Sequence, residues 1–183
     1  MATISKLVTY DDYRTLPDDG KRYEIIGGEL YMTPAPTTYH QRILGNLYMQ
    51  MRHFTDKSNL GEVLMAPVDI VLSMTDVIQP DLIYIAKSRA HIITRKNIVA
   101  APDLVVEIIS ESTEAIDQNQ KKQLYERYGV KEYWLVYPEK KQVEQFILRD
   151  QAFTLQNTYQ VPDSLKSNIL SGFSVELKNI FVG

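Results

Sequence analysis

Residues 104–109, LVVEII, constrain the fold more than any other segment, because one acidic residue, Glu107, interrupts a run that is otherwise apolar. The side chains of a strand alternate between its two faces. One face therefore carries Asp103, Val105, Glu107 and Ile109, and the other carries Leu104, Val106 and Ile108. Both faces are mostly apolar, which predicts a strand in a sheet that is covered on both sides.

Glu107 needs a partner in such a strand. An unpaired, ionised carboxylate in a protein interior costs several kcal/mol. A lysine, an arginine or a metal ion would each compensate its charge. A structural ion pair is the simpler interpretation, and a functional site is the alternative.

The rest of the sequence predicts one α/β domain over residues 1–183. Hydrophobic periodicity and turn residues predict a hairpin at 22–32, with its turn at Gly27 and Gly28, followed by a helix at about 37–55. Strands follow at 62–72, 80–86 and 103–110, and then a helix at about 114–128 that ends at Gly129. A hairpin formed by 132–138 and 142–148 comes next, and short strands are expected in the last thirty residues. We therefore expect a mixed β-sheet core flanked by helices, with an additional N-terminal hairpin and C-terminal short strands.

The composition excludes several classes of protein. The chain contains no cysteine, which rules out disulfides, thiolate zinc sites and a cysteine nucleophile. Residues 1–6 begin no apolar segment long enough for a signal peptide. No segment approaches the roughly 20 apolar residues of a membrane span. These features favour a cytoplasmic protein without a membrane partner.

Charge gives a local signal for nucleic acid binding but no global one. The net charge is −3, so the whole chain does not attract a polyanion. No acidic residue lies between Asp81 and Asp103, however, and four basic residues do: Lys87, Arg89, Arg95 and Lys96. This segment is either a phosphate-binding patch or a solvated loop.

Two more residues complete a possible site around Glu107. Asp81 follows Pro80 at the start of the preceding apolar strand. On a helical wheel of about 100° per residue, Lys121 falls in the inward arc, whereas Lys122 points toward water. That arc is defined by Ile116, Leu124, Tyr125 and Tyr128. Two carboxylates that hold Mg²⁺ and a lysine that stabilises the attacking water or the phosphate charge are the parts of a metal-dependent phosphodiesterase.

Asp103 is the other acid near Glu107. It shares a strand face with Glu107, but four residues of strand separate the two by about 13 Å. One metal ion cannot bind both at bond lengths of about 2.1 Å. Asp103 is therefore interpreted as a strand-start residue, and Asp81 as the metal partner of Glu107.

Three segments of the sequence carry a resemblance to a known family: RYEIIGGELYMTPAPTTYHQRI, QPDLIYI and PDLVVEIISESTEAIDQNQKKQLYERYGVKEYWLVYP. Over roughly residues 9–180 the chain resembles the bacterial Uma2 family, labelled "putative restriction endonuclease", within the PD-(D/E)XK nuclease superfamily. The resemblance implies a restriction-endonuclease-like fold in which Asp81 is the first acid, Glu107 the second and Lys121 the lysine. It also implies the backbone carbonyl of Ile108 as a third metal ligand. Ile109 stands where the superfamily motif has its lysine, and related families carry that lysine on the following helix.

Glu24 and His40 also match the family pattern. Glu24 is expected either as an additional acid at the metal site or as a surface or ion-paired strand residue. His40, in the first turn of the long helix, either contacts the scissile phosphate, orients Glu24, or is a packed or capping residue.

The expected function is a Mg²⁺-dependent nuclease that acts on DNA, with Mn²⁺ able to replace Mg²⁺. The alternative is an inactive relative that binds nucleic acid or protein and keeps the site as an ion-pair core. In a nuclease, Asp81, Glu107 and Lys121 should converge on one opening, whereas in the inactive relative they should be buried or dispersed. Residues 132–138 and 142–148 and the tail GFSVELKNIFVG are expected to leave apolar surface uncovered. That surface, and the two sites needed to cleave both strands of a duplex, predict a homodimer.

Overall fold

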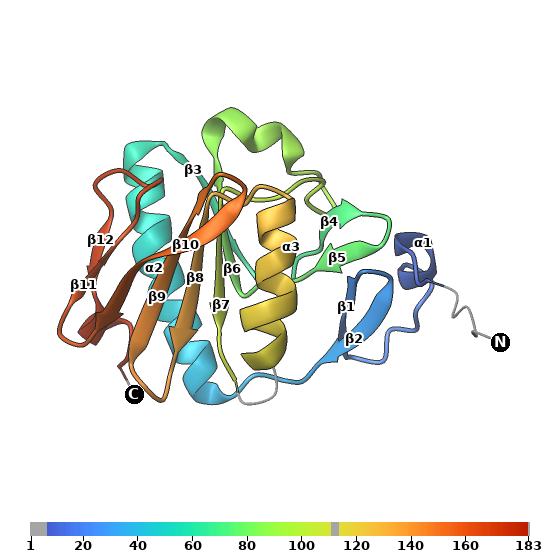
Figure 1. Ribbon diagram of the computed structural model, residues 1–183, viewed down its shortest axis with the longest axis horizontal. Coiled ribbons are helices and arrows are strands. Elements are labelled where there is room, and N and C mark those ends of the chain that lie inside the picture. Colours follow the sequence, from blue (N-terminus) through green and yellow to red (C-terminus); the bar gives the residue numbers. More distant parts are fainter. Residues whose placement is uncertain (1–6, 111–113, 183) are drawn as a thin grey trace.

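The computed structural model describes residues 7–110 and 114–182. Its centre is a six-stranded sheet with the strand order β10-β9-β8-β7-β6-β3 (Figure 1). The six strands are β3 (Gly61–Met65), β6 (Leu82–Ala86), β7 (Leu104–Ile108), β8 (Glu132–Tyr137), β9 (Gln142–Arg149) and β10 (Ala152–Gln160). The predicted mixed sheet is confirmed, because β7 and β8 are parallel while every other neighbouring pair is antiparallel. The expectation about a signal peptide concerns residues 1–6, which lie outside the described residues.

The parallel pair requires a crossover, and a helix supplies it. The crossover contains a π-helical segment, η2 (Ile116–Lys121), followed directly by α3 (Lys122–Arg127). Gly129 comes directly after the helix with a φ of 77°, which a glycine adopts without strain. The helix predicted at 114–128 is therefore present, but part of it has π rather than α geometry.

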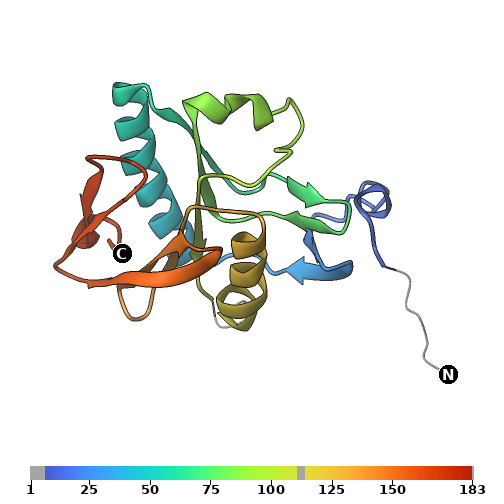
Figure 2. The same ribbon diagram turned by 45° about the horizontal axis from the view of Figure 1, so that its top comes forward.

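Helices cover the sheet on both faces, as the alternation in residues 104–109 predicts. The long helix α2 (Thr38–Ser58) lies on one face and α3 on the other (Figures 1 and 2). Leu104, Val106 and Ile108 pack in the core under α2, and Val105 and Ile109 pack in the core under α3. The short strands β11 (Ser164–Lys166) and β12 (Ser174–Glu176) and the 3-10 turn η3 (Leu177–Asn179) complete the α2 side.

A second sheet carries the N-terminal hairpin. Its strand order is β2-β1-β5-β4, formed by β1 (Arg22–Ile26), β2 (Glu29–Thr33), β4 (Ile70–Ser73) and β5 (Asp76–Ile78). The predicted turn is confirmed, with Gly27 and Gly28 both at positive φ. The short helix α1 (Tyr10–Tyr13) precedes this hairpin, and a 3-10 segment, η1 (Lys87–Ile92), follows β6. Within the described residues, no helix combines the length and the apolar character that crossing a lipid bilayer requires.

Two expectations from the sequence are wrong. The continuous strand predicted at 62–72 is split between β3 and β4, which belong to different sheets. Pro67 lies at the break, and proline cannot donate a ladder hydrogen bond. The apolar segments expected to remain uncovered are largely covered by the chain itself: all six residues of β8 are buried, and so are Leu177 and Ile180 in the tail, although Val182 is exposed. The homodimer stays a prediction that rests on the need for two sites.

Asp103 ties three segments of the fold together, in keeping with its interpretation as a strand-start residue. It is 1% exposed and accepts a hydrogen bond from the backbone amide of Ala86 at 2.9 Å. It also pairs with Arg89 at 3.1 Å and with Lys131 at 2.7 Å. Burial alone would raise the pKa of Asp103, but the Ala86 amide and the two cations outweigh it and hold the pKa below its usual value.

Replacing Asp103 with asparagine should lower the free energy of unfolding by about 2 kcal/mol, because two charge-assisted contacts weaken. The folded-state pKa is lowered, so the carboxylate stabilises the fold fully above its unfolded pKa of about 3.9 and loses this effect as the pH falls through the folded value. Chemical unfolding of the wild type and of Asp103→Asn at several pH values measures the difference. If the difference in unfolding free energy between the two proteins stays constant down to pH 2, the stabilising role assigned to the Asp103 carboxylate is contradicted.

Candidate active site

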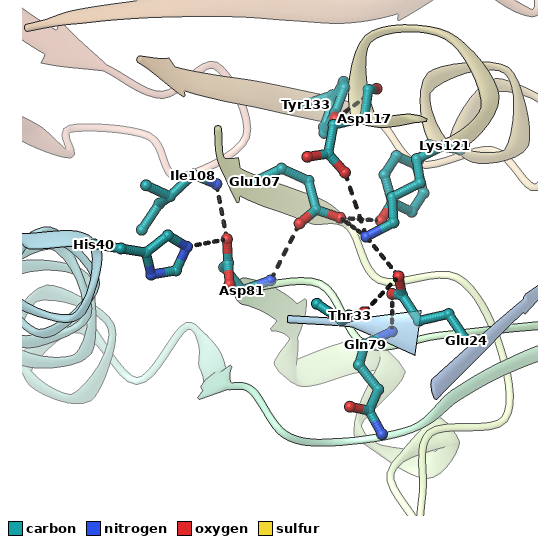
Figure 3. Close-up of polar contacts among 11 residues, drawn as sticks. Glu24, Thr33, His40, Gln79, Asp81, Glu107, Ile108, Asp117, Lys121 and Tyr133 are labelled. Carbon is teal, nitrogen blue, oxygen red and sulfur yellow. Dashed lines mark hydrogen bonds and ion pairs between the residues drawn. The ribbon is translucent and has the colours of Figure 1, made fainter. Parts of the chain in front are cut away.

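A buried lysine gathers carboxylates from three elements. Lys121 is 5% exposed, and its Nζ lies 3.0 Å from Glu24, 3.2 Å from Glu107 and 3.4 Å from Asp117 (Figure 3). Glu24 comes from β1, Glu107 from β7, and Asp117 from the same π-helical segment as Lys121. An ammonium group has three N–H donors, so these carboxylates can engage all of them.

The π-helical segment turns both Asp117 and Lys121 toward the sheet, and both are buried. The predicted inward direction of Lys121 is confirmed. The predicted direction of Lys122 is wrong: this residue is half-buried, and its Nζ lies 3.9 Å from the centre of the Phe146 ring. The error follows from treating a segment with i→i+5 hydrogen bonds as a regular α-helix.

Asp81 lies beside Glu107, as predicted from their two neighbouring strands. Its backbone amide is 3.4 Å from a Glu107 carboxylate oxygen, and its own Oδ2 accepts a 2.8 Å hydrogen bond from the amide of Ile108 (Figure 3). The N–H and C=O of one strand residue point to the same side. The Ile108 carbonyl therefore faces the Asp81 side of β7.

His40 contacts Asp81 and not Glu24. Its Nε2 lies 3.0 Å from Asp81 Oδ2 (Figure 3), so the suggestion that it orients Glu24 is wrong. Thr37 caps the helix and accepts a hydrogen bond from the His40 amide at 3.1 Å, which fixes the start of α2 and the position of the ring. Nδ1 of His40 is buried and has no hydrogen-bond partner among the described residues.

Glu24 is a buried, ion-paired strand residue. Besides its contact with Lys121, it accepts a 2.7 Å hydrogen bond from the backbone amide of Gln79 and a 3.5 Å one from Thr33. It belongs to the same cluster as Glu107 because Lys121 bridges the two.

Two members of this site, Asp117 and Tyr125, were not predicted from the sequence. Asp117 is 2% exposed and lies four residues before Lys121, a spacing that places both on one helix face and could have identified it. Tyr125 was recognised only as an apolar core position. Its hydroxyl donates a 2.6 Å hydrogen bond to Glu107, and no feature of the sequence alone indicates this contact.

The cluster carries more negative than positive formal charge. Three buried acids, Glu24, Glu107 and Asp117, surround one buried lysine, and a fourth, Asp81, adjoins Glu107. Burial raises the pKa of Glu107 well above its usual value, and the neighbouring carboxylates add to the shift although Lys121 opposes it. Burial lowers the pKa of Lys121, but the three carboxylates outweigh this effect and raise the pKa well above its usual value. Lys121 is therefore a permanent cation in a site that favours additional positive charge.

These residues converge on one pocket of about 440 Å³. Asp81, Glu107, Ile108 and Lys121 line it together with His40. Residues 33–37, which connect β2 to α2, and the start of the β8–β9 turn form other parts of its wall. Asp81, Glu107 and Lys121 thus line one opening, as expected of a nuclease, but all three are also buried, as expected of the inactive relative.

The donors in this pocket suit Mg²⁺. Among the residues that the structure describes, no group of three or more His, Cys, Asp or Glu side chains is arranged to hold a metal ion. A metal here would depend on the carboxylates of Asp81 and Glu107 and on the main-chain oxygen of Ile108. Mg²⁺ prefers hard oxygen ligands and usually retains several waters beside one or two carboxylates, so the set fits it.

The basic segment between Asp81 and Asp103 lies away from this pocket. Asp81 precedes β6, whereas Lys87 follows it, so the length of the strand, about 17 Å, separates them. Arg89 is engaged by Asp103 and by the carbonyl of Ala101. None of the four basic residues lines the pocket.

Comparisons with known proteins agree with this architecture. The Uma2 family model, described as "Putative restriction endonuclease", matches residues 10–178. A crystal structure from Anabaena variabilis ATCC 29413, described as "a putative nuclease belonging to DUF820", superimposes with a TM-score of 0.79 over 95% of this chain and 97% of that chain. The two sequences are 19% identical, so this likeness establishes the fold alone. No curated protein matches the chain in sequence.

The family model spans nearly the whole chain, including both acids, the lysine and the hairpin that carries Glu24. This chain therefore belongs to the Uma2 family, whose description is "putative restriction endonuclease".

Proposed function

We propose that the protein is a Mg²⁺-dependent nuclease that hydrolyses phosphodiester bonds in DNA. The convergence of Asp81, Glu107 and Lys121 on one pocket carries this proposal. Membership of a family described as "Putative restriction endonuclease" supports the same reaction class. Cleavage of both strands of a duplex needs two sites, for which a symmetric homodimer is the matching assembly.

Asp81, Glu107 and the carbonyl of Ile108 would hold the metal. When bound, Mg²⁺ polarises the scissile phosphate and lowers the pKa of a water molecule. The Ile108 amide and His40 orient the carboxylate of Asp81, and Tyr125 orients that of Glu107. Lys121 places a fixed positive charge beside Glu107, where it stabilises negative charge that develops on the phosphate.

One observation favours the alternative, an inactive relative that binds nucleic acid or protein. The three carboxylates around Lys121 can engage every donor of its amine. Such a cluster is complete as an ion-pair core without a metal or a substrate. Measurements of metal binding and of DNA cleavage distinguish this alternative from a nuclease.

Wild-type protein should nick supercoiled plasmid in Mg²⁺ or Mn²⁺ and not in EDTA. Asp81→Asn and Glu107→Gln should each abolish nicking, because each removes a charged oxygen donor for the metal. Gel electrophoresis of the plasmid over time measures the reaction. Nicking that survives EDTA, or that persists in both variants, would show that the assigned site is not responsible.

Mn²⁺ should raise the thermal unfolding temperature of the wild type as its concentration increases, because a ligand that binds only the folded state stabilises it. The Glu107→Gln variant should lose this response. In EDTA the variant should be at least as stable as the wild type, because it removes one of four crowded acids while Lys121 keeps two carboxylate partners. Equal stabilisation of both proteins by Mn²⁺ would contradict Glu107 as a ligand.

Lys121→Ala should reduce the nicking rate by about 100-fold while metal binding remains. It should also lower the free energy of unfolding by about 3–5 kcal/mol, because it leaves buried carboxylates without their partner. Rates must therefore be compared at a temperature at which both proteins are folded, as checked by circular dichroism.

Lys122→Ala is the matched control, since Lys122 is adjacent in sequence but packs on Phe146 outside the cluster. It should keep the wild-type nicking rate and lose at most about 1 kcal/mol of stability. Equal rates for Lys121→Ala and Lys122→Ala would remove Lys121 from the mechanism.

A further inference from the structure

Without a bound metal, the pocket needs a second cation beside Lys121 to receive a nucleic acid strand. Its buried acids outnumber its buried lysine, so it repels an approaching phosphodiester. Lys121 lies within 3.4 Å of three carboxylates and can bind a phosphate only by giving up one of these contacts. Among the described residues, Arg22 and Lys121 are the two lysines or arginines that line the pocket.

The position of Arg22 in β1 directs its side chain into the pocket. Arg22 and Glu24 are two residues apart in the strand and therefore share a face, and Glu24 points to Lys121 on that side. Tyr23, on the opposite face, donates a hydrogen bond to the exposed Asp19. The backbone of Arg22 pairs with Thr33, which also lines the pocket.

The guanidinium of Arg22 is available for a ligand. The side chain is half-buried, and it forms no ion pair or hydrogen bond with any other residue that the structure describes. Lys121, by contrast, is fully buried, so Arg22 lies nearer to the mouth of the pocket. The planar fork of an arginine matches two oxygens of a phosphate, and such bidentate contacts are among the stronger hydrogen bonds.

We propose that Arg22 is a phosphate-binding residue that anchors the nucleic acid strand at the mouth of the pocket. This inference rests on the proposed nuclease function for the identity of the ligand. Arg22 makes its contact to the backbone of the strand, so it contributes affinity that is independent of base sequence. It offsets the negative charge of the pocket at the point where the strand enters.

The test is a binding measurement without cleavage. Fluorescence anisotropy in EDTA follows binding of single-stranded and duplex DNA oligonucleotides of one sequence across a series of salt concentrations. Losing one phosphate contact lowers the slope of log K against log salt by about 0.9 for a duplex and about 0.7 for a single strand. Arg22→Ala should show this change and bind about tenfold more weakly to whichever DNA form the wild type prefers.

Two further variants separate charge, geometry and folding. Arg22→Lys keeps the positive charge but loses the planar guanidinium that contacts two phosphate oxygens. This variant should therefore retain the salt slope and bind DNA several-fold more weakly. Lys21→Ala is the matched control: Lys21 is the neighbouring cation, exposed and paired with Asp19 at 3.4 Å, and its removal should leave slope and affinity unchanged. Circular dichroism of all three variants shows that each is folded.

The outcomes distinguish this inference from the proposed function. Three results would each overturn the role of Arg22. The salt slope could be unchanged in Arg22→Ala, Lys21→Ala could lose as much DNA affinity as Arg22→Ala, or the wild type could bind neither DNA form. If Arg22→Ala behaves as expected but the wild type nicks no plasmid, the nuclease proposal fails and the phosphate anchor stands. If the wild type nicks plasmid and Arg22→Ala binds DNA as the wild type does, the nuclease proposal stands and the phosphate anchor fails.

Discussion

The ion-pair cluster around Lys121 is the interaction on which the site and the arrangement of the two sheets depend. Its amine joins Glu24 of the hairpin sheet, Glu107 of the central sheet and Asp117 of the crossover helix. These acids are at most 4% exposed, so water cannot compensate them in the absence of the lysine. The same contact links the small sheet to the large one, while the pairing of β6 with β7 places Glu107 beside Asp81. Lys121 therefore contributes both to the fold and to the proposed reaction. A substitution at Lys121 must be judged on stability as well as on the nicking rate.

Three buried acids of the central sheet show how the surroundings of a carboxylate decide its role. Asp103 is satisfied by two cations and a backbone amide that join neighbouring segments. Glu132 forms no ion pair with any residue that the structure describes, but it accepts five hydrogen bonds, from Trp134, Gln145, Ser167 and the amides of Asn168 and Ile169. The carboxylates of Asp103 and Glu132 are therefore both satisfied by contacts within the fold. Glu107 alone of the three lines the pocket and adjoins other carboxylates, and its pKa is raised by burial and further by those carboxylates.

Features set by local periodicity could be predicted from the sequence, and features set by contacts between distant segments could not. Alternation in residues 104–109 gave the two covered faces, and the helical wheel gave the direction of Lys121. The break at Pro67 was missed because both halves of residues 62–72 have strand character, and only their pairing shows that they enter different sheets. The basic residues at 87–96 are close to Asp81 in sequence, but β6 carries the chain to the far end of the sheet. Gln79 and Lys121, two partners of Glu24, lie 55 residues and more away, a distance at which no pattern in one sequence indicates contact.

The order of these elements along the chain also governs how the site can assemble. Glu24, Asp81 and Glu107 all precede Lys121, and Glu24 lies nearly one hundred residues before it. Contacts between such distant segments form slowly, because the loop between them must close before any stabilisation is gained. The three acids must therefore remain hydrated until the crossover helix docks on the sheet. Docking of that helix and burial of the charges are therefore expected to occur together, because Lys121 is the cation that compensates the buried acids.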